Sequence, residues 1–118
     1  MARRYDQYGN NPGALRLDFS LTIGATGAVT DTEGKGATIA RSGTGEYTVT
    51  LEQGAAGHYD FRATSFKAAN VPLWGKITTD SISSGSFIFT MYDNSGSATD
   101  PASGQLLEVS FALKTKNI

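Results

Sequence analysis

The stretch Ala14-Leu-Arg-Leu-Asp-Phe-Ser-Leu-Thr-Ile23 alternates apolar and polar side chains from Leu15 onward. Successive side chains of an extended chain point to opposite faces. One face therefore carries the apolar residues Leu15, Leu17, Phe19, Leu21 and Ile23, and the other carries Arg16, Asp18, Ser20 and Thr22. We therefore predict a half-buried strand over Ala14–Ile23. Turn residues follow at 24–27, and residues 28–30 are predicted to return antiparallel to this strand as a hairpin.

Six further segments show short strand patterns separated by glycine-rich turns. They are 37–41, 46–52, 58–66, 73–79, 87–92 and 106–113. The last two are apolar on both faces, at least in part, so we expect them to lie centrally or beneath a partner surface. Seven or eight short strands predict an all-β fold, an antiparallel β-sandwich or jelly-roll-like domain, and no helix is required.

Length and composition exclude several classes of protein. A chain of 118 residues is the size of one domain. Ten basic and eleven acidic residues give a net charge of -1, which disfavours a nucleic-acid partner. The absence of cysteine excludes disulfides and thiolate metal sites. No apolar run approaches the roughly 20 residues of a membrane span, so no membrane partner is predicted.

The first thirteen residues differ from the rest because they show no strand periodicity. We predict an extended, flexible N-terminal arm over 1–13, followed by a single β-domain over 14–118. At about 3.5 Å per residue the arm spans roughly 45 Å, enough to touch a neighbouring subunit. Arginine and tyrosine are enriched at protein interfaces. The predicted docking residues of the arm are Arg3, Arg4, Tyr5 and Tyr8.

Side chains capable of chemistry are few and scattered. His58 is the only histidine, and we interpret it as a solvent-facing or loop-end residue on the polar side of its strand. Several residues of the glycine-rich loops carry oxygen atoms, namely Asp31, Glu33, Asp93, Asn94 and Asp100. We interpret them as ordinary turn residues. They could bind calcium only if two of the loops converged. We predict no catalytic residue, no metal site and no cofactor.

Two aromatic residues on different predicted strands are candidates for binding. Trp74 and Tyr92 could form a platform on which a sugar ring stacks, but a single tryptophan in a small β-domain is more often a core or interface residue. We therefore predict that Trp74 and Tyr92 contact a partner subunit. No pair among Asp18, Glu46 and Asp60 is singled out for glycoside hydrolysis.

Three stretches of the chain resemble a family of small virion structural proteins of tailed bacteriophages. They are the glycine-ended hairpin over 22–29, the strand motif Arg-x-Gly-x-Gly-x-Tyr-Thr-Val-Thr-Leu over 41–51, and the Asp-Pro-x-x-Gly turn over 100–104 with the terminal strand after it. The order and spacing of these motifs carry the resemblance, which covers most of the chain from Leu15 onward. Residues 52–58 depart from the family pattern, which has a longer apolar connection there.

The resemblance implies a non-enzymatic capsid decoration, or cement, protein. Such a protein binds the major capsid protein on the outside of the head, after spending assembly in the host cytoplasm. By the same analogy we expect self-association as a homotrimer. Two alternatives remain open: a tail or receptor-binding module that grips a host glycan with loop 93–101, and a small hydrolase that uses His58 or a carboxylate pair.

Overall fold

The protein is an all-β domain of eight strands, as the sequence predicts. The computed structural model describes residues 14–52, 55–68 and 70–114. The strands are β1 (Ala14–Ile23), β2 (Val29–Glu33), β3 (Ala37–Gly43), β4 (Glu46–Leu51), β5 (Gly57–Ala68), β6 (Val71–Ser81), β7 (Ser86–Tyr92) and β8 (Leu106–Lys114). Two 3₁₀ turns, Ala25–Gly27 and Ile82–Ser84, are the only helical segments in these ranges. Within them, no helix is long and apolar enough to cross a membrane.

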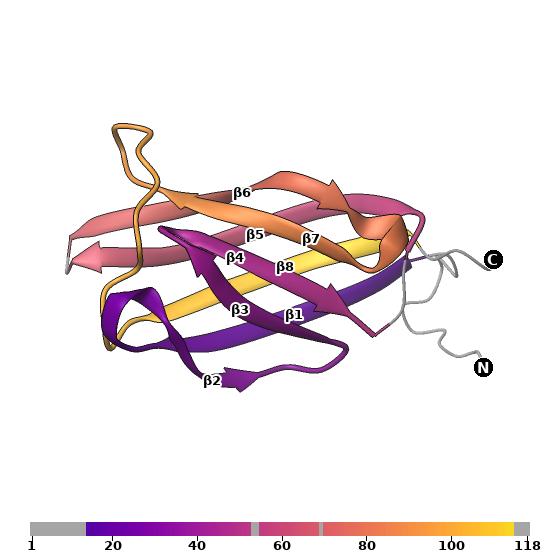
Figure 1. The fold of residues 1–118 in the computed structure, drawn as a ribbon, viewed down its shortest axis with the longest axis horizontal. Helices are drawn as coiled ribbons and strands as arrows, with labels where there is room; N and C mark the ends of the chain where they lie inside the picture. Colours follow the sequence, from indigo (N-terminus) through magenta and orange to yellow (C-terminus); the bar gives the residue numbers. More distant parts are fainter. Residues whose placement is uncertain (1–13, 53–54, 69, 115–118) are drawn as a thin grey trace.

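All eight strands belong to one antiparallel sheet that curls round on itself. The strand order is β2-β1-β8-β5-β6-β7-β4-β3, so the two outermost strands, β2 and β3, are consecutive in the chain. These two strands approach each other without forming a hydrogen-bonded ladder, which makes the sheet a nearly closed barrel (Figure 1). The central positions expected for 87–92 and 106–113 are confirmed, because β7 lies between β6 and β4 and β8 lies between β1 and β5.

One face of every long strand fills the interior of the barrel. The alternation of β1 places Phe19, Leu21 and Ile23 in the core, and the alternation of β8 adds four more apolar side chains. The largest fully buried side chains are Tyr47, Phe87, Phe89 and Phe111. Phe61 packs among three of these rings, at 6.0 Å from Phe87, 5.2 Å from Phe89 and 6.4 Å from Phe111 between ring centroids. Aromatic packing therefore holds the opposite walls of the barrel together.

A glycine permits the tight passage where the sheet closes between β2 and β3. Gly34 has a positive φ of 141°, and a Cβ atom there would lie 2.4 Å from a ring carbon of Phe19. Any other residue would combine an unfavourable backbone with a clash against a buried ring. Gly34 thus lets the chain run close over β1 and turn into β3.

Candidate functional site

The outer face of the barrel carries a row of side chains that crosses four strands. Thr64 of β5 stands opposite Trp74 of β6 on one side and Glu108 of β8 on the other, and Trp74 stands opposite Tyr92 of β7. Trp74, Thr64 and Glu108 are exposed, whereas their neighbours along the strands point into the core. A small threonine thus lies between a large aromatic residue and a long acidic one, which leaves a trough over β5.

This trough is part of a groove of about 560 Å³ near one end of the barrel. Trp74 and Leu106 line it, as do Phe66 and Pro72, which face each other between β5 and β6. Trp74, Phe66 and Leu106 are 46%, 43% and 49% exposed, which is high for large apolar side chains. We call this site the Trp74 groove. An apolar groove that stays open to solvent is the usual form of a binding site.

The two aromatic residues singled out from the sequence lie together in the structure. The ring centroids of Trp74 and Tyr92 are 5.2 Å apart with an interplanar angle of 36°, and the ammonium group of Lys76 lies 5.6 Å from the centroid of the Tyr92 ring. Trp74 is not a core residue, since nearly half of its surface is exposed. Tyr92 packs against the indole, so the Trp74 side chain has a fixed neighbour on the sheet surface.

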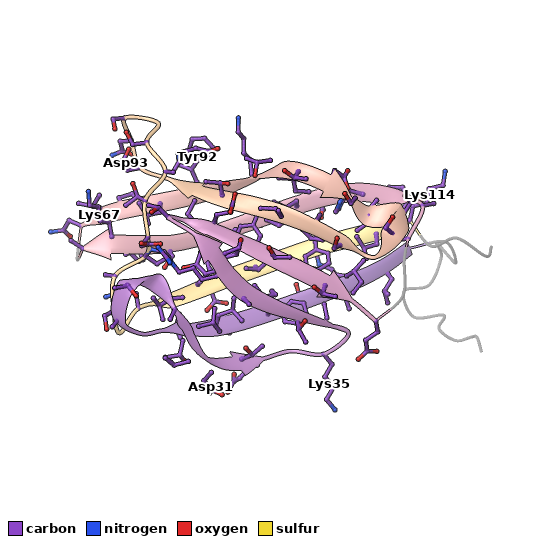
Figure 2. All side chains as sticks on the ribbon, viewed as in Figure 1. Asp31, Lys35, Lys67, Tyr92, Asp93 and Lys114 are labelled. Atoms are coloured by element: carbon purple, nitrogen blue, oxygen red, sulfur yellow. The ribbon has the colours of Figure 1, made fainter. Side chains whose placement is uncertain are left out.

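A loop rich in hydrogen bonds stands beside the groove. Figure 2 shows Tyr92 and Asp93 where this loop leaves β7. The Asp93 carboxylate accepts hydrogen bonds from Ser95 N and Oγ at 2.9 and 2.7 Å, from Ser97 N at 3.1 Å and from Thr99 Oγ1 at 3.3 Å. The hydrogen bond from the Ser95 hydroxyl is the largest of the effects that lower the pKa of Asp93 to about 2. This loop also places Asn94 in the wall of the groove.

A second cluster of polar groups ties the same connection to the β3–β4 hairpin. Asp100 Oδ1 and Oδ2 accept hydrogen bonds from Arg41 Nε and Nη2, both at 2.9 Å, and Oδ1 also accepts one from Gly45 N at 2.8 Å. We call this cluster the Arg41–Asp100 clamp. Beside it, the Tyr47 hydroxyl donates to the Gly27 carbonyl oxygen at 2.6 Å. The hairpin over 22–29, the strand motif over 41–51 and the turn over 100–104 therefore meet at one place in the fold.

The electrostatics of the clamp are those of a structural ion pair. Burial raises the pKa of Asp100, but the hydrogen bonds from Arg41 and Gly45 and the charge of Arg41 outweigh burial, so the net shift is downward. The hydrogen bond with Asp100 in turn raises the pKa of Arg41. Burial raises the pKa of the Tyr47 hydroxyl, which keeps it a hydrogen-bond donor. All three groups keep the protonation state that their contacts need at neutral pH.

His58 does not point to solvent, so the interpretation of its side chain as solvent-facing is wrong. Its side chain is only 12% exposed, and its ring meets Phe87 edge-on with centroids 4.7 Å apart. The reason is a β-bulge between His58 and Asp60, which breaks the alternation that the sequence suggests. The bulge turns the imidazole inward and leaves Tyr59 53% exposed. The nearest acidic group is Asp80, whose Oδ1 lies 3.4 Å from His58 Nε2.

Two of the carboxylates considered for calcium face protein donors, whereas Asp31 and Glu33 are exposed on β2. Asp93 binds its own loop and Asp100 binds Arg41. Across the part of the chain that the structure describes, no three metal-ligating residues gather into a group. The predicted docking residues of the arm, Arg3, Arg4, Tyr5 and Tyr8, lie outside the described residues.

Sequence reasoning found the aromatic pair but not the rest of the groove. Phe66, Leu106 and Glu108 fall in predicted strands without any role, and Pro72 stands just before one. A signal was present, because Leu106 is the one large apolar residue on the outer face of β8, whose other large apolar residues alternate inward. Comparisons of the chain with protein-family models, curated proteins and solved structures found no match.

Proposed function

We propose that this protein is a non-enzymatic virion structural protein of a tailed bacteriophage, a capsid decoration protein that binds the outside of the head. The observation that carries the proposal is the meeting of the three family-like motifs around the Arg41–Asp100 clamp. Each motif alone is common in β-hairpins. Their contacts in one cluster give the three motifs a joint structural role in this chain.

The distribution of exposed apolar side chains supports a bridging role. Leu15 and Tyr59 are 43% and 53% exposed and lie at the end of the barrel where β1 begins and β8 finishes. The Trp74 groove lies toward the other end, where β8 begins. Lys67 and Lys114 mark these two ends in Figure 2. At about 3.3 Å per residue along β8, the two patches are roughly 23 Å apart.

The end at Leu15 is the one we assign to capsid docking. The arm joins the domain at Ala14, next to Leu15, so both would approach the same capsid surface. Many identical weak contacts on one particle give strong attachment through avidity, and a homotrimer would multiply each contact further. In this arrangement the arm residues and the exposed side chains of Leu15 and Tyr59 bind the major capsid protein.

Cosedimentation with capsids tests the proposal. Full-length protein is mixed with empty heads of a candidate phage, and its mass in solution is measured by light scattering. We expect trimers that saturate the heads at a fixed ratio per capsomer. Deletion of residues 1–13 or Tyr59→Ser should leave a folded domain with reduced occupancy, whereas Lys35→Ser, an exposed change between β2 and β3, should bind normally. A protein that ignores capsids, or a truncated domain with full occupancy, contradicts the proposal.

A further inference from the structure

The Trp74 groove combines a fixed aromatic surface with polar groups that lack protein partners. Tyr92 packs against Trp74 at 5.2 Å, so the indole has a neighbour that limits its freedom while 46% of it stays exposed. Binding to such a side chain costs little conformational entropy. Within the described ranges, the side-chain amides of Asn94 and Gln105, which also line the groove, have no hydrogen-bond partner.

Glu108, which also lines the groove, is an acceptor with spare capacity. Glu108 accepts a hydrogen bond from Ser20 Oγ at 3.0 Å through Oε2. A carboxylate accepts about four hydrogen bonds, so most of its capacity is available to a ligand. The groove therefore offers an apolar surface next to one strong acceptor and two amides that both donate and accept.

We propose that the Trp74 groove is a carbohydrate-binding site for a short neutral oligosaccharide. A sugar ring has an apolar C–H face that packs on an indole, and hydroxyl groups at its rim that bind carboxylates and amides. The volume of about 560 Å³ lies within the range of about 300 to 1,000 Å³ typical of small-ligand sites. Glu108 in the wall disfavours acidic sugars by repulsion between like charges, which selects neutral ones.

The inference stands apart from the capsid proposal. The groove is displaced toward the end of the barrel opposite Leu15, so a ligand there leaves the assigned capsid surface free. A decoration protein built in this way would display a sugar-binding site on the outside of the particle. Loss of capsid binding and loss of sugar binding are measured separately, so each proposal stands or fails alone.

Trp74 is the only tryptophan of the chain, so intrinsic fluorescence reports directly on the groove. The probes are cellotriose, maltotriose, xylotriose and diacetylchitobiose, each titrated to about 10 mM because single-site sugar binding is often weak. Trigalacturonic acid is the acidic comparison and a proline-rich decapeptide the protein-like one. We expect a saturable shift of the emission with at least one neutral sugar and a weaker response to the acidic one.

Matched variants separate the groove from the rest of the surface. Glu108→Ala should weaken the binding of the responding sugar about tenfold, as expected for loss of a hydrogen bond to a charged group. Glu33→Ala, an exposed glutamate of β2, is the control and should bind as the parent does. Saturation-transfer NMR with the same sugar should lose its signal in Trp74→Ala. The inference is overturned if no neutral sugar gives a saturable response, if both glutamate variants behave alike, or if only the peptide binds.

Discussion

Replacing Asp100 with alanine removes the centre of the Arg41–Asp100 clamp. The carboxylate accepts three hydrogen bonds, two from Arg41 at 2.9 Å and one from Gly45 N at 2.8 Å. A hydrogen bond to a charged group contributes about 1.5 to 3 kcal/mol, but the Asp100 side chain is 25% exposed and solvent screens part of this. We expect a loss of about 2 to 4 kcal/mol in the free energy of unfolding. For a domain of this size that lowers Tm by roughly 8 to 16 °C.

Calorimetry and urea unfolding measure this loss directly, and a double-mutant comparison assigns it to the clamp. Arg41→Met should destabilise the parent protein strongly but should have little further effect in the Asp100→Ala background, because its partner is already gone. Asp31→Ala, an exposed aspartate of β2, is the matched control and should leave Tm almost unchanged. The reasoning is refuted if Asp100→Ala unfolds at the same temperature as Asp31→Ala. It is also refuted if the losses of unfolding free energy caused by Asp100→Ala and Arg41→Met are fully additive in the double mutant.

Three further predictions concern the backbone, pH and the buried histidine. Gly45→Ala should lower the thermal stability far more than Gly96→Ala. Both residues have a positive φ, but of the two only Gly45 would bring a Cβ atom to within 2.8 Å of backbone atoms of another segment. Equal losses of stability in the two variants would exclude this clash. The protein should lose stability as the pH falls from about 4 to about 2, because the pKa of Asp93 is lowered from its ordinary 3.8 to about 2 in the folded state. Asp93→Asn should therefore flatten the dependence of stability on pH in this range. An unchanged dependence in this variant would contradict the prediction. His58→Leu should keep or raise Tm, because neither ring nitrogen of His58 has a hydrogen-bond partner within the described residues. A fall in Tm of more than about 5 °C would contradict this prediction.

The strands were predictable from the sequence because their alternation is a local property. Leu15–Ile23 repeats the two-residue period so cleanly that both the strand and its inward face follow from the sequence, whereas for 106–113 only the existence of the strand follows. The bulge between His58 and Asp60 was not predictable, because the residue types around it do not differ from those of a regular strand. The extra residue turns the side chains that precede it to the opposite face of the sheet. For this reason the sequence did not predict that His58 points inward.

The groove depends on strand order, which a single sequence does not reveal. Trp74 and Tyr92 are far apart in the chain and meet only because β6 pairs with β7, and Glu108 joins them only because β8 pairs with β5. The strand patterns were equally compatible with other arrangements of the same strands. The clamp shows the same limit, because Arg41 and Asp100 were noted in separate motifs and their contact was not foreseen.

The clamp and the groove are joined by the connection between β7 and β8. Asp93 organises the start of this connection and Asp100 fixes its middle to the β3–β4 hairpin. Its end is fixed as well, because Ile23 N donates to the carbonyl oxygen of Gln105 at 3.0 Å. Asn94 and Gln105 therefore project into the groove from a segment that is held at three points. Since a preformed site loses less entropy on binding, the hydrogen bonds that hold this connection also support the site proposed for sugar binding.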